Sequence, residues 1–144
     1  MTNLSKRLEC IASFIQKDDK VIDVGCDHGY LSIYLAKTKQ CSDIIASDVN
    51  QNALNNAISN IKKENLNEAI KTILSDGLKQ IDVINYDTLI ISGMGTNTIL
   101  NILNDKEKLV SIKKIIIQSN NDHYLLRKEM KKRGFFIEQE KIIF

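Results

Sequence analysis

The stretch Val21-Ile22-Asp23-Val24-Gly25-Cys26-Asp27-His28-Gly29 decides the fold. Its first four residues are an apolar run interrupted by one aspartate, which predicts a short buried strand. Gly25 ends that run, and a helical pattern follows through Lys37. A strand that passes through a glycine turn into a helix is the repeating unit of an α/β sheet.

The same alternation of strand and helix continues along the chain. An amphipathic helix is expected over residues 3–16, ahead of the first strand. The later predicted elements are strands at 44–47, 70–74, 87–92 and 115–119, helices at 52–64, 97–109 and 122–133, a C-cap at Gly134, and an extended segment at 135–144. Because the strands are near-continuous apolar runs, we predict a doubly wound, mainly parallel α/β sheet with helices on both faces.

Length and composition indicate one domain, residues 1–144. A chain of 144 residues has room for one hydrophobic core but not for two. No apolar run approaches the roughly 20 residues that a membrane-spanning helix requires. Met1 leads into polar residues and not into a secretory signal. We therefore expect no membrane partner and a cytoplasmic location.

Metal ligands are scarce in the sequence. The three cysteines, Cys10, Cys26 and Cys41, lack CxxC spacing, and the two histidines form no HExxH pattern. Buried reduced thiols are the simpler interpretation of the cysteines. We expect neither a disulfide framework nor a metal site.

The turn after the first strand is the first candidate binding site. In doubly wound sheets, ligands bind beyond the carboxyl ends of the strands. Gly25 lets the backbone approach a ligand closely, and Cys26 follows it in the same turn. The turn lacks the full GxGxxG pattern, and Asp27 puts a negative charge where a dinucleotide would place its pyrophosphate. Asp23 and Asp27 suit a cationic ligand such as S-adenosylmethionine, although a plain strand-to-helix turn stays open as the alternative.

Acidic residues also follow the next two predicted strands. Asp48 lies 25 residues after Asp23, where a carboxylate can accept hydrogen bonds from both ribose hydroxyls, and Val49 is adjacent to it. Asp76-Gly77 follows the third strand, where a carboxylate can accept from an adenine amine. A single aspartate is more often a helix N-cap. Three at successive strand ends favour an adenosine site.

The turn after the fourth strand, Ser92-Gly93-Met94-Gly95, is expected to face the transferable methyl group. Its two glycines leave room for a planar base, with a plain glycine turn as the alternative. The Asn-Pro-Pro-aromatic motif of many amino-methylating enzymes is absent here. This favours a ring nitrogen as methyl acceptor, because its lone pair attacks directly and catalysis is largely alignment.

Five segments together resemble the bacterial tRNA (adenine-22-N1) methyltransferase family, TrmK. They are residues 4–8, 23–31, 75–78, 91–95 and 117–120. The resemblance implies a class I methyltransferase fold that uses S-adenosylmethionine to methylate N1 of an adenine in the D-loop region of tRNA. The chain departs from the family pattern at Cys26, Gly29, Thr96 and Ser119.

We also hypothesise roles at the substrate end of the site. Asp27 and His28 are expected to orient the base or receive a proton from its amine, and Tyr30 to stack on it. A structural hydrogen-bond donor at a helix start is the alternative for His28. Asn120 is expected to contact the base edge and Arg7 a phosphate or the cofactor carboxylate, with Gly95 in the same pocket. Gly93 and Met94 are assigned to the cofactor.

Family members continue past the point equivalent to Phe144 into a final strand and a helical, coiled-coil-like domain. We therefore expect residues 1–144 to be a fragment or a reduced relative that binds cofactor but methylates tRNA poorly. A sheet without its last strands has unpaired edges, through which association is possible. The sequence does not determine the oligomeric state.

Two other functions compete with the methyltransferase interpretation. One is a non-catalytic module that binds S-adenosylmethionine or S-adenosylhomocysteine, and the other is a nicotinamide-dependent enzyme, which the glycine turn argues against. The net charge of +2 identifies no partner. A basic face and a solvated helix surface are equally compatible with the basic residues gathered in the last third, namely Lys113, Lys114, Arg127, Lys128, Lys131, Lys132 and Arg133.

Overall fold

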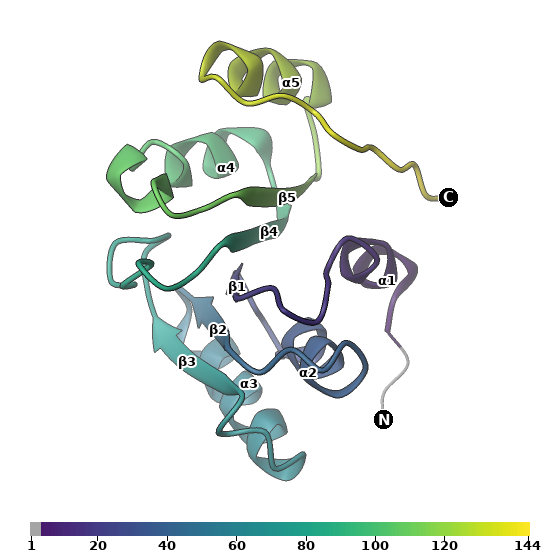
Figure 1. The fold of residues 1–144 in the computed structure, drawn as a ribbon, viewed down its shortest axis with the longest axis vertical. Helices are drawn as coiled ribbons and strands as arrows, with labels where there is room; N and C mark the ends of the chain where they lie inside the picture. Colours follow the sequence, from purple (N-terminus) through teal and green to yellow (C-terminus); the bar gives the residue numbers. More distant parts are fainter. Residues whose placement is uncertain (1–3) are drawn as a thin grey trace.

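The computed structural model describes residues 4–144, which form a five-stranded parallel sheet with strand order β3-β2-β1-β4-β5 (Figure 1). The strands are β1 Val21–Val24, β2 Ile44–Asp48, β3 Ile70–Leu74, β4 Thr88–Met94 and β5 Lys114–Ser119. The strand order reverses between β1 and β4, which places a switch point at the carboxyl ends of these two strands. The prediction of a doubly wound parallel sheet is confirmed.

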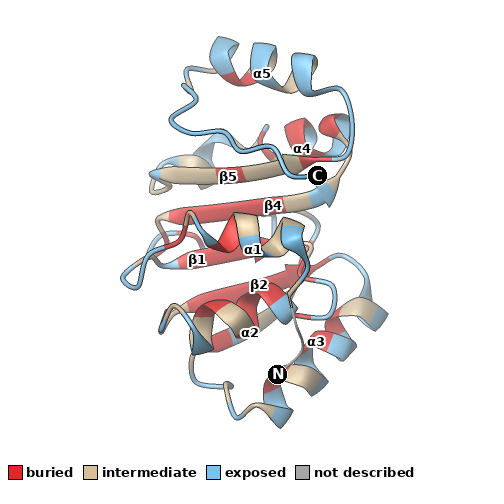
Figure 2. Cartoon of the chain, turned by 90° about the vertical axis from the view of Figure 1, so that its right-hand side faces the viewer, coloured by how far each residue is buried: buried red, intermediate tan, exposed pale blue. Residues whose placement is uncertain are grey.

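Helices cover both faces of the sheet. They are α1 Lys6–Ala12, α2 Tyr30–Lys37, α3 Gln51–Lys63, α4 Thr96–Ile102, the short 3-10 helix η1 Lys106–Leu109, and α5 His123–Lys132. Val21 packs into the core formed with α1, α2 and α3, whereas Ile22 and Val24 pack into the core formed with α4 and α5. This alternation follows the two-residue period of a strand. Figure 2 shows β1, β2 and β4 mostly buried between the two helical layers.

Two predicted helices are shorter than expected. The helix predicted at 3–16 spans only Lys6–Ala12, and its expected first residue lies outside the described part of the chain. After it, the amides of Phe14 and Ile15 donate to the carbonyls three residues back, as in a tightened final turn. The helix predicted at 97–109 is α4 followed by η1, because Asp105 between them leaves the helical region at φ −81° and ψ 79°.

Strand β4 continues two residues further than expected. The predicted strand ends at Ser92, but the structure extends it to Met94 through a register irregularity between Ser92 and Met94. Gly93 lies inside this irregularity with φ 77°, a conformation that glycine adopts readily. The residues of this irregularity line the cavity described below.

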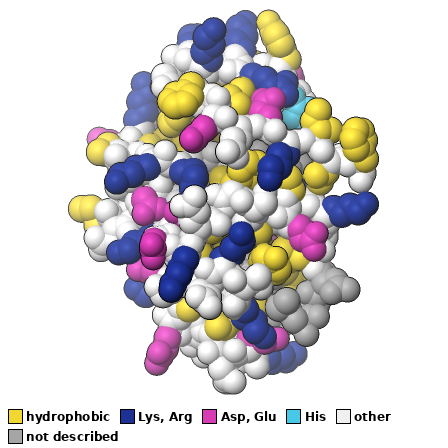
Figure 3. Space-filling view, turned by 45° about the vertical axis from the view of Figure 1, so that its right-hand side comes forward, with side chains coloured by type: hydrophobic (Ala, Val, Ile, Leu, Met, Phe, Trp, Pro, Cys, Tyr) yellow, Lys and Arg dark blue, Asp and Glu magenta, His cyan; other side chains and the backbone are white. Residues whose placement is uncertain are grey.

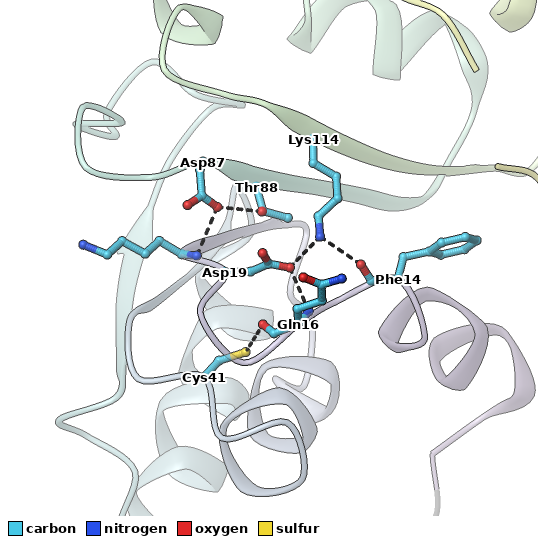
Figure 4. A network of polar contacts seen from close by, with 8 residues as sticks. Phe14, Gln16, Asp19, Cys41, Asp87, Thr88 and Lys114 are labelled. Carbon is cyan, nitrogen blue, oxygen red and sulfur yellow. Dashed lines mark hydrogen bonds and ion pairs between the residues drawn. The ribbon is translucent and has the colours of Figure 1, made fainter. Parts of the chain in front are cut away.

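A polar network holds the chain before β1 against the amino end of β5 (Figure 4). Lys114 Nζ donates to the carbonyl of Phe14 and to Asp19 Oδ2. Asp19 Oδ2 also accepts from the Gln16 amide, and the Cys41 thiol donates to the Gln16 carbonyl. This network lies at the end of the sheet opposite the expected binding site.

The segment after α5 crosses toward α1 without joining the sheet (Figures 1 and 2). The C-cap of α5 is Arg133, one residue earlier than expected, and Gly134 follows it with φ 93°, the left-handed conformation typical of the residue after a helix C-cap. Arg127 on α5 forms an ion pair with Glu140, and Lys141 Nζ donates to Ser13 Oγ. Within residues 4–144, β3 and β5 form the edges of the sheet. No helix in this part of the chain is long and apolar enough to cross a membrane.

Candidate functional site

A cavity of about 340 Å³ opens at the carboxyl ends of β1, β2 and β4. It is lined by Arg7, Leu8, Asp23, Gly25, Cys26, Asp27, His28, Tyr30, Leu31, Asp48, Ser92, Gly93 and Met94. The structure therefore brings together most of the residues that the sequence analysis assigned to the site. Ser92 belongs to the turn expected to face the methyl group, although it was given no role of its own. Leu8 and Leu31 were missed, although they lie on the apolar faces of helices next to predicted site residues.

The glycine turn after β1 is held by two backbone hydrogen bonds. The amides of Gly25 and Cys26 both donate to the Ser47 carbonyl at 2.8 Å, which ties the turn to β2. Gly25 has φ 78°, and a Cβ atom at this position would lie 2.6 Å from Met94 Cε. Glycine is therefore favoured by the backbone conformation, and any side chain here would also displace the end of the Met94 side chain.

The carboxylate of Asp48 is fixed at the end of β2. Its Oδ2 accepts from the Asp27 amide and its Oδ1 from the Asn50 amide, each at 3.0 Å. Each carboxylate oxygen has a further lone pair. Asp48 can therefore still accept hydrogen bonds from a ligand in the cavity, and the two amides hold it in place without one.

Asp23 is a buried acid at the wall of the cavity. Its pKa is raised from the usual 3.8 to about 7, mainly by burial and to a smaller extent by the nearby Asp48, while the hydrogen bond from Ser32 Oγ opposes the shift. An uncompensated buried charge is unfavourable. A positively charged group in the cavity would therefore stabilise the ionised form of this carboxyl.

Cys26 borders the same cavity but is not a nucleophile. Burial, together with the neighbouring charges of Asp23, Asp48 and Asp27, raises the pKa of its thiol far above the usual range. The thiolate is the reactive form of cysteine. The protonated thiol of Cys26 therefore serves as a small packing group.

Asp27, His28 and Tyr30 form the outer rim of the cavity. The rings of His28 and Tyr30 are stacked, with centroids 5.3 Å apart and planes inclined by 24°. Asp27 Oδ1 lies 3.8 Å from His28 Nε2, and both side chains are largely exposed. The arrangement is an open aromatic surface beside a carboxylate.

A carboxamide joins three separate elements at the other side of the cavity. Gln118 Oε1, at the end of β5, accepts from Arg7 Nη1 at 3.1 Å and from the Gly93 amide at 2.8 Å. Gln118 Nε2 donates to Asn120 Oδ1. Both partners of Gln118 Oε1 can only donate, so the orientation of the Gln118 side-chain amide is fixed. Its NH₂ group therefore faces Asn120 Oδ1, and the NH₂ group of Asn120 remains available to donate to a ligand. The sequence analysis included Gln118 in a motif but gave it no role.

Some predicted site residues lie outside the lining of the cavity. Val49 is 69% exposed, and Asp76 forms an exposed ion pair with Lys79 at 3.2 Å. Gly77 faces Ile102 of α4, and Gly95 lies against Asn121. Asn120 does not line the cavity, but its amide donates to the Met94 carbonyl at 2.9 Å and its Oδ1 accepts from Gln118 Nε2. Their expected roles remain predictions.

Residues 4–144 contain no group of three or more His, Cys, Asp or Glu side chains placed to hold a metal ion. The acidic groups of the cavity come from strand ends and from the turn after β1, and Arg7 of α1 adds a positive charge. A glycine turn after β1 and a fixed acid at the end of β2, without a pyrophosphate-binding turn, define a nucleoside-binding α/β domain of the class I methyltransferase type. The sequence of residues 4–144 matches the methyltransferase domain family, and the chain belongs to that family.

Relatives and solved structures agree with this assignment. The tRNA (adenine(22)-N(1))-methyltransferase of Bacillus subtilis is 31% identical over 97% of the chain and 59% of that protein. TrmK of M. capricolum, solved with S-adenosylhomocysteine, is 36% identical with a TM-score of 0.87, over 98% of this chain and 63% of that one. The structure of B. subtilis TrmK gives a TM-score of 0.93 at 31% identity, over 100% of this chain and 62% of that one.

More distant similarity extends to another substrate class. A ribosomal protein L11 methyltransferase of Thermotoga neapolitana is 28% identical over 91% of the chain and 49% of that protein. The resemblance to TrmK noted from the sequence is confirmed by the closer matches. The chain spans 64% and 59% of the lengths of its Mycoplasma genitalium and B. subtilis relatives.

Proposed function

We propose that this chain binds S-adenosylmethionine and methylates N1 of an adenine in the D-loop region of tRNA. The observation that carries the proposal is Asp48, held by two backbone amides at the wall of a cavity that also contains the Gly25 turn. The identity of 31–36% to TrmK proteins supports the substrate and the position of methylation. A tRNA substrate would place the protein in the cytoplasm.

The residues of the cavity fit this cofactor. Asp48 has the lone pairs to accept from ribose hydroxyls, and Gly25 allows the backbone to approach closely. Asp23 is a buried carboxyl that a sulfonium or ammonium group would stabilise in its charged form. When bound, the cofactor supplies an electrophilic methyl group. Val49, Asp76, Gly77 and Met94 complete the proposed cofactor site.

The substrate side of the site offers hydrogen-bond donors and an aromatic surface. Arg7 and the NH₂ group of Asn120 donate, and their orientation is fixed through Gln118. The His28–Tyr30 pair provides rings on which an extruded base can stack. Methylation of N1 gives the base a positive charge, which the carboxylate of Asp27 favours. Gly93 and Gly95 leave room for the base at the end of β4.

The nicotinamide alternative lacks support at the site. A dinucleotide requires backbone amides free to bind a pyrophosphate. The amides of Gly25 and Cys26 both donate to Ser47, and the Asp27 amide donates to Asp48. The turn therefore has few amides left for phosphate oxygens.

The first test is calorimetric titration of the chain with S-adenosylhomocysteine, with NADH as the comparator. We expect binding of S-adenosylhomocysteine only, weakened at least about tenfold by Asp48→Asn, which corresponds to the loss of about 1.4 kcal/mol. Binding of NADH alone would contradict the proposal.

The second test measures methyl transfer from labelled S-adenosylmethionine to a tRNA transcript. We expect N1-methyladenosine by mass spectrometry, and no product when the target adenosine is replaced by guanosine. Label on the exocyclic amine, or equal transfer to both transcripts, would contradict the assigned chemistry.

A further inference from the structure

A second cavity, of about 200 Å³, lies beside the first and is lined by residues of α2 and α3, by Glu64 after α3, and by Leu4, which precedes α1. Tyr30 lines both cavities, so the two lie next to each other at this residue. The lining also includes Tyr34 on α2 and Asn60 and Lys63 on α3. Neither the sequence analysis nor the proposed function uses Tyr34, Asn60 or Lys63.

The walls of the second cavity combine aromatic surface with one unpaired positive charge. Tyr30 and Tyr34 are four residues apart on α2 and therefore project from the same face of the helix. Glu64 forms an ion pair with Lys37. Within residues 4–144, no carboxylate lies within ion-pair distance of Lys63, which keeps its charge available to a ligand.

One hydrogen-bonding side chain of this cavity, Asn60, is already engaged in a contact within the protein. Asn60 Nδ2 donates to the carbonyl of His28 at 2.9 Å, which connects the wall of the second cavity to the rim of the first. With its NH₂ group held there, Asn60 Oδ1 is oriented by the same contact and remains an acceptor. The cavity is thus lined by two tyrosines, an acceptor for a base edge, and a cation.

We propose that the second cavity binds a nucleotide of the RNA strand next to the methylated adenosine. This inference rests on the proposed function. Extruding one base from its stack leaves a neighbouring base unstacked, and an aromatic side chain can replace the lost contact. Tyr34 and Tyr30 supply that surface, and Lys63 neutralises a backbone phosphate. Because Tyr30 is shared, the two cavities can hold consecutive nucleotides of one strand.

The chemistry of the walls does not suit a second copy of the cofactor. The fixed carboxylate of Asp48 and the buried acid Asp23 both line the larger cavity only. The one acid of the smaller cavity, Glu64, is engaged by Lys37. An anionic, planar ligand fits these walls, and a cationic one does not.

The test compares Lys63→Ala and Tyr34→Leu with the matched control Lys62→Ala. Lys62 and Lys63 are adjacent exposed residues at the end of α3, but only Lys63 lines the cavity. Leucine at position 34 keeps the apolar contact with the core while removing the aromatic face. Affinity for a fluorescent tRNA transcript is measured by anisotropy at several salt concentrations, and affinity for S-adenosylhomocysteine by calorimetry.

We expect Tyr34→Leu to weaken tRNA binding on the order of tenfold and Lys63→Ala to weaken it several-fold and lower the salt dependence by about one ion. Lys62→Ala should change tRNA affinity less than about twofold. S-adenosylhomocysteine affinity should be unchanged in all three variants, which also shows that each is folded.

Equal effects of Lys63→Ala and Lys62→Ala would overturn the proposal, because they would indicate general electrostatic attraction. An unaltered chain that binds S-adenosylhomocysteine but not tRNA would overturn it as well. Failure to bind S-adenosylhomocysteine would instead count against the proposed function itself. The two failures are therefore distinguishable.

Discussion

At the residue scale, the site contains a buried carboxyl group, which lowers the stability of the folded state, and backbone conformations that favour glycine. Asp23 is a carboxyl buried at the end of β1, where its charge has no cation among the described residues to compensate it. Gly25 and Gly93 take positive φ values that other residues adopt with strain. Such features persist where a binding site needs them.

We predict that Asp23 makes the protein less stable as the pH rises from about 4 to about 7. The unfolded carboxyl ionises near its usual 3.8, whereas burial raises the folded pKa to about 7. Between these values the folded state holds a proton that the unfolded chain has lost, so the free energy of unfolding falls, by up to about 1.4 kcal/mol per pH unit. Denaturant unfolding across this range, with Asp23→Asn as comparator, measures the effect. An unchanged pH slope in the variant would show that Asp23 does not cause it.

The backbone requirement at Gly25 can be separated from its close contact with Met94. Gly25→Ala and Gly134→Ala both force a side chain into a positive-φ conformation, which destabilises by about 1–2 kcal/mol. Only at Gly25 does the new Cβ meet Met94 Cε, at 2.6 Å, whereas at Gly134 nothing lies within 4 Å. We expect both variants to lose stability in chemical denaturation and only Gly25→Ala to lose affinity for S-adenosylhomocysteine. Equal affinity of the two variants for S-adenosylhomocysteine would show that the turn after β1 is not needed for cofactor binding.

At the scale of elements, the site depends on contacts between parts that are distant in sequence. Arg7 of α1 and Gln118 of β5 are 111 positions apart and meet at 3.1 Å. Gly93 joins the same carboxamide from the bend in β4. The position of α1 over the cavity is therefore fixed partly by a strand from the other end of the chain.

Two substitutions at Gln118 distinguish the contribution of its accepting oxygen from that of its donating NH₂ group. Gln118→Glu keeps an acceptor for Arg7 and for the Gly93 amide but loses the donor to Asn120, whereas Gln118→Ala loses all three hydrogen bonds. We expect stability near that of the unaltered chain for Gln118→Glu and a loss of about 1–2 kcal/mol for Gln118→Ala. If Gln118 positions Asn120, both variants raise KM for tRNA while S-adenosylhomocysteine affinity stays unchanged. Full retention of KM by Gln118→Glu would exclude that positioning role.

At the scale of the whole molecule, binding and structural contacts lie at opposite ends of the sheet. The carboxyl ends carry the cavity, and the amino ends carry the network around Lys114 (Figure 4). On the face drawn in Figure 3, Lys and Arg side chains are spread among Asp and Glu side chains and form no continuous basic area. RNA binding on that face would depend on particular lysines and not on a uniform basic surface.

We expect Lys114→Met to lower stability without changing the site. The substitution removes the hydrogen bonds from Nζ to Phe14 and Asp19, while methionine keeps the apolar part of the side chain. A loss of about 1–3 kcal/mol is typical for a partly buried charged hydrogen bond. Thermal unfolding should detect it, and S-adenosylhomocysteine affinity in the folded protein should be unaffected. A weakened affinity would show that the two ends of the sheet are coupled.

The strands were predictable because their signal is local. Strands β1 and β3 have the expected bounds. In β1 every residue is buried, and such a strand has few polar residues to interrupt its apolar run. Helix bounds were predicted less well. The break at Asp105 and the short α1 depend on how the chain leaves the helix to meet the rest of the fold, and apolar spacing does not record this.

The sequence by itself determined the strand-to-helix order, the glycine turn after β1, and the acids at the strand ends, because parallel topology brings all carboxyl ends to one edge of the sheet. Only the tertiary structure decided which of these groups share a cavity. It placed Asp76 and Val49 outside the lining, joined Gln118 to Arg7, and formed a second cavity at Tyr30. Such contacts join residues far apart in the chain, and local sequence patterns do not encode the distances between them.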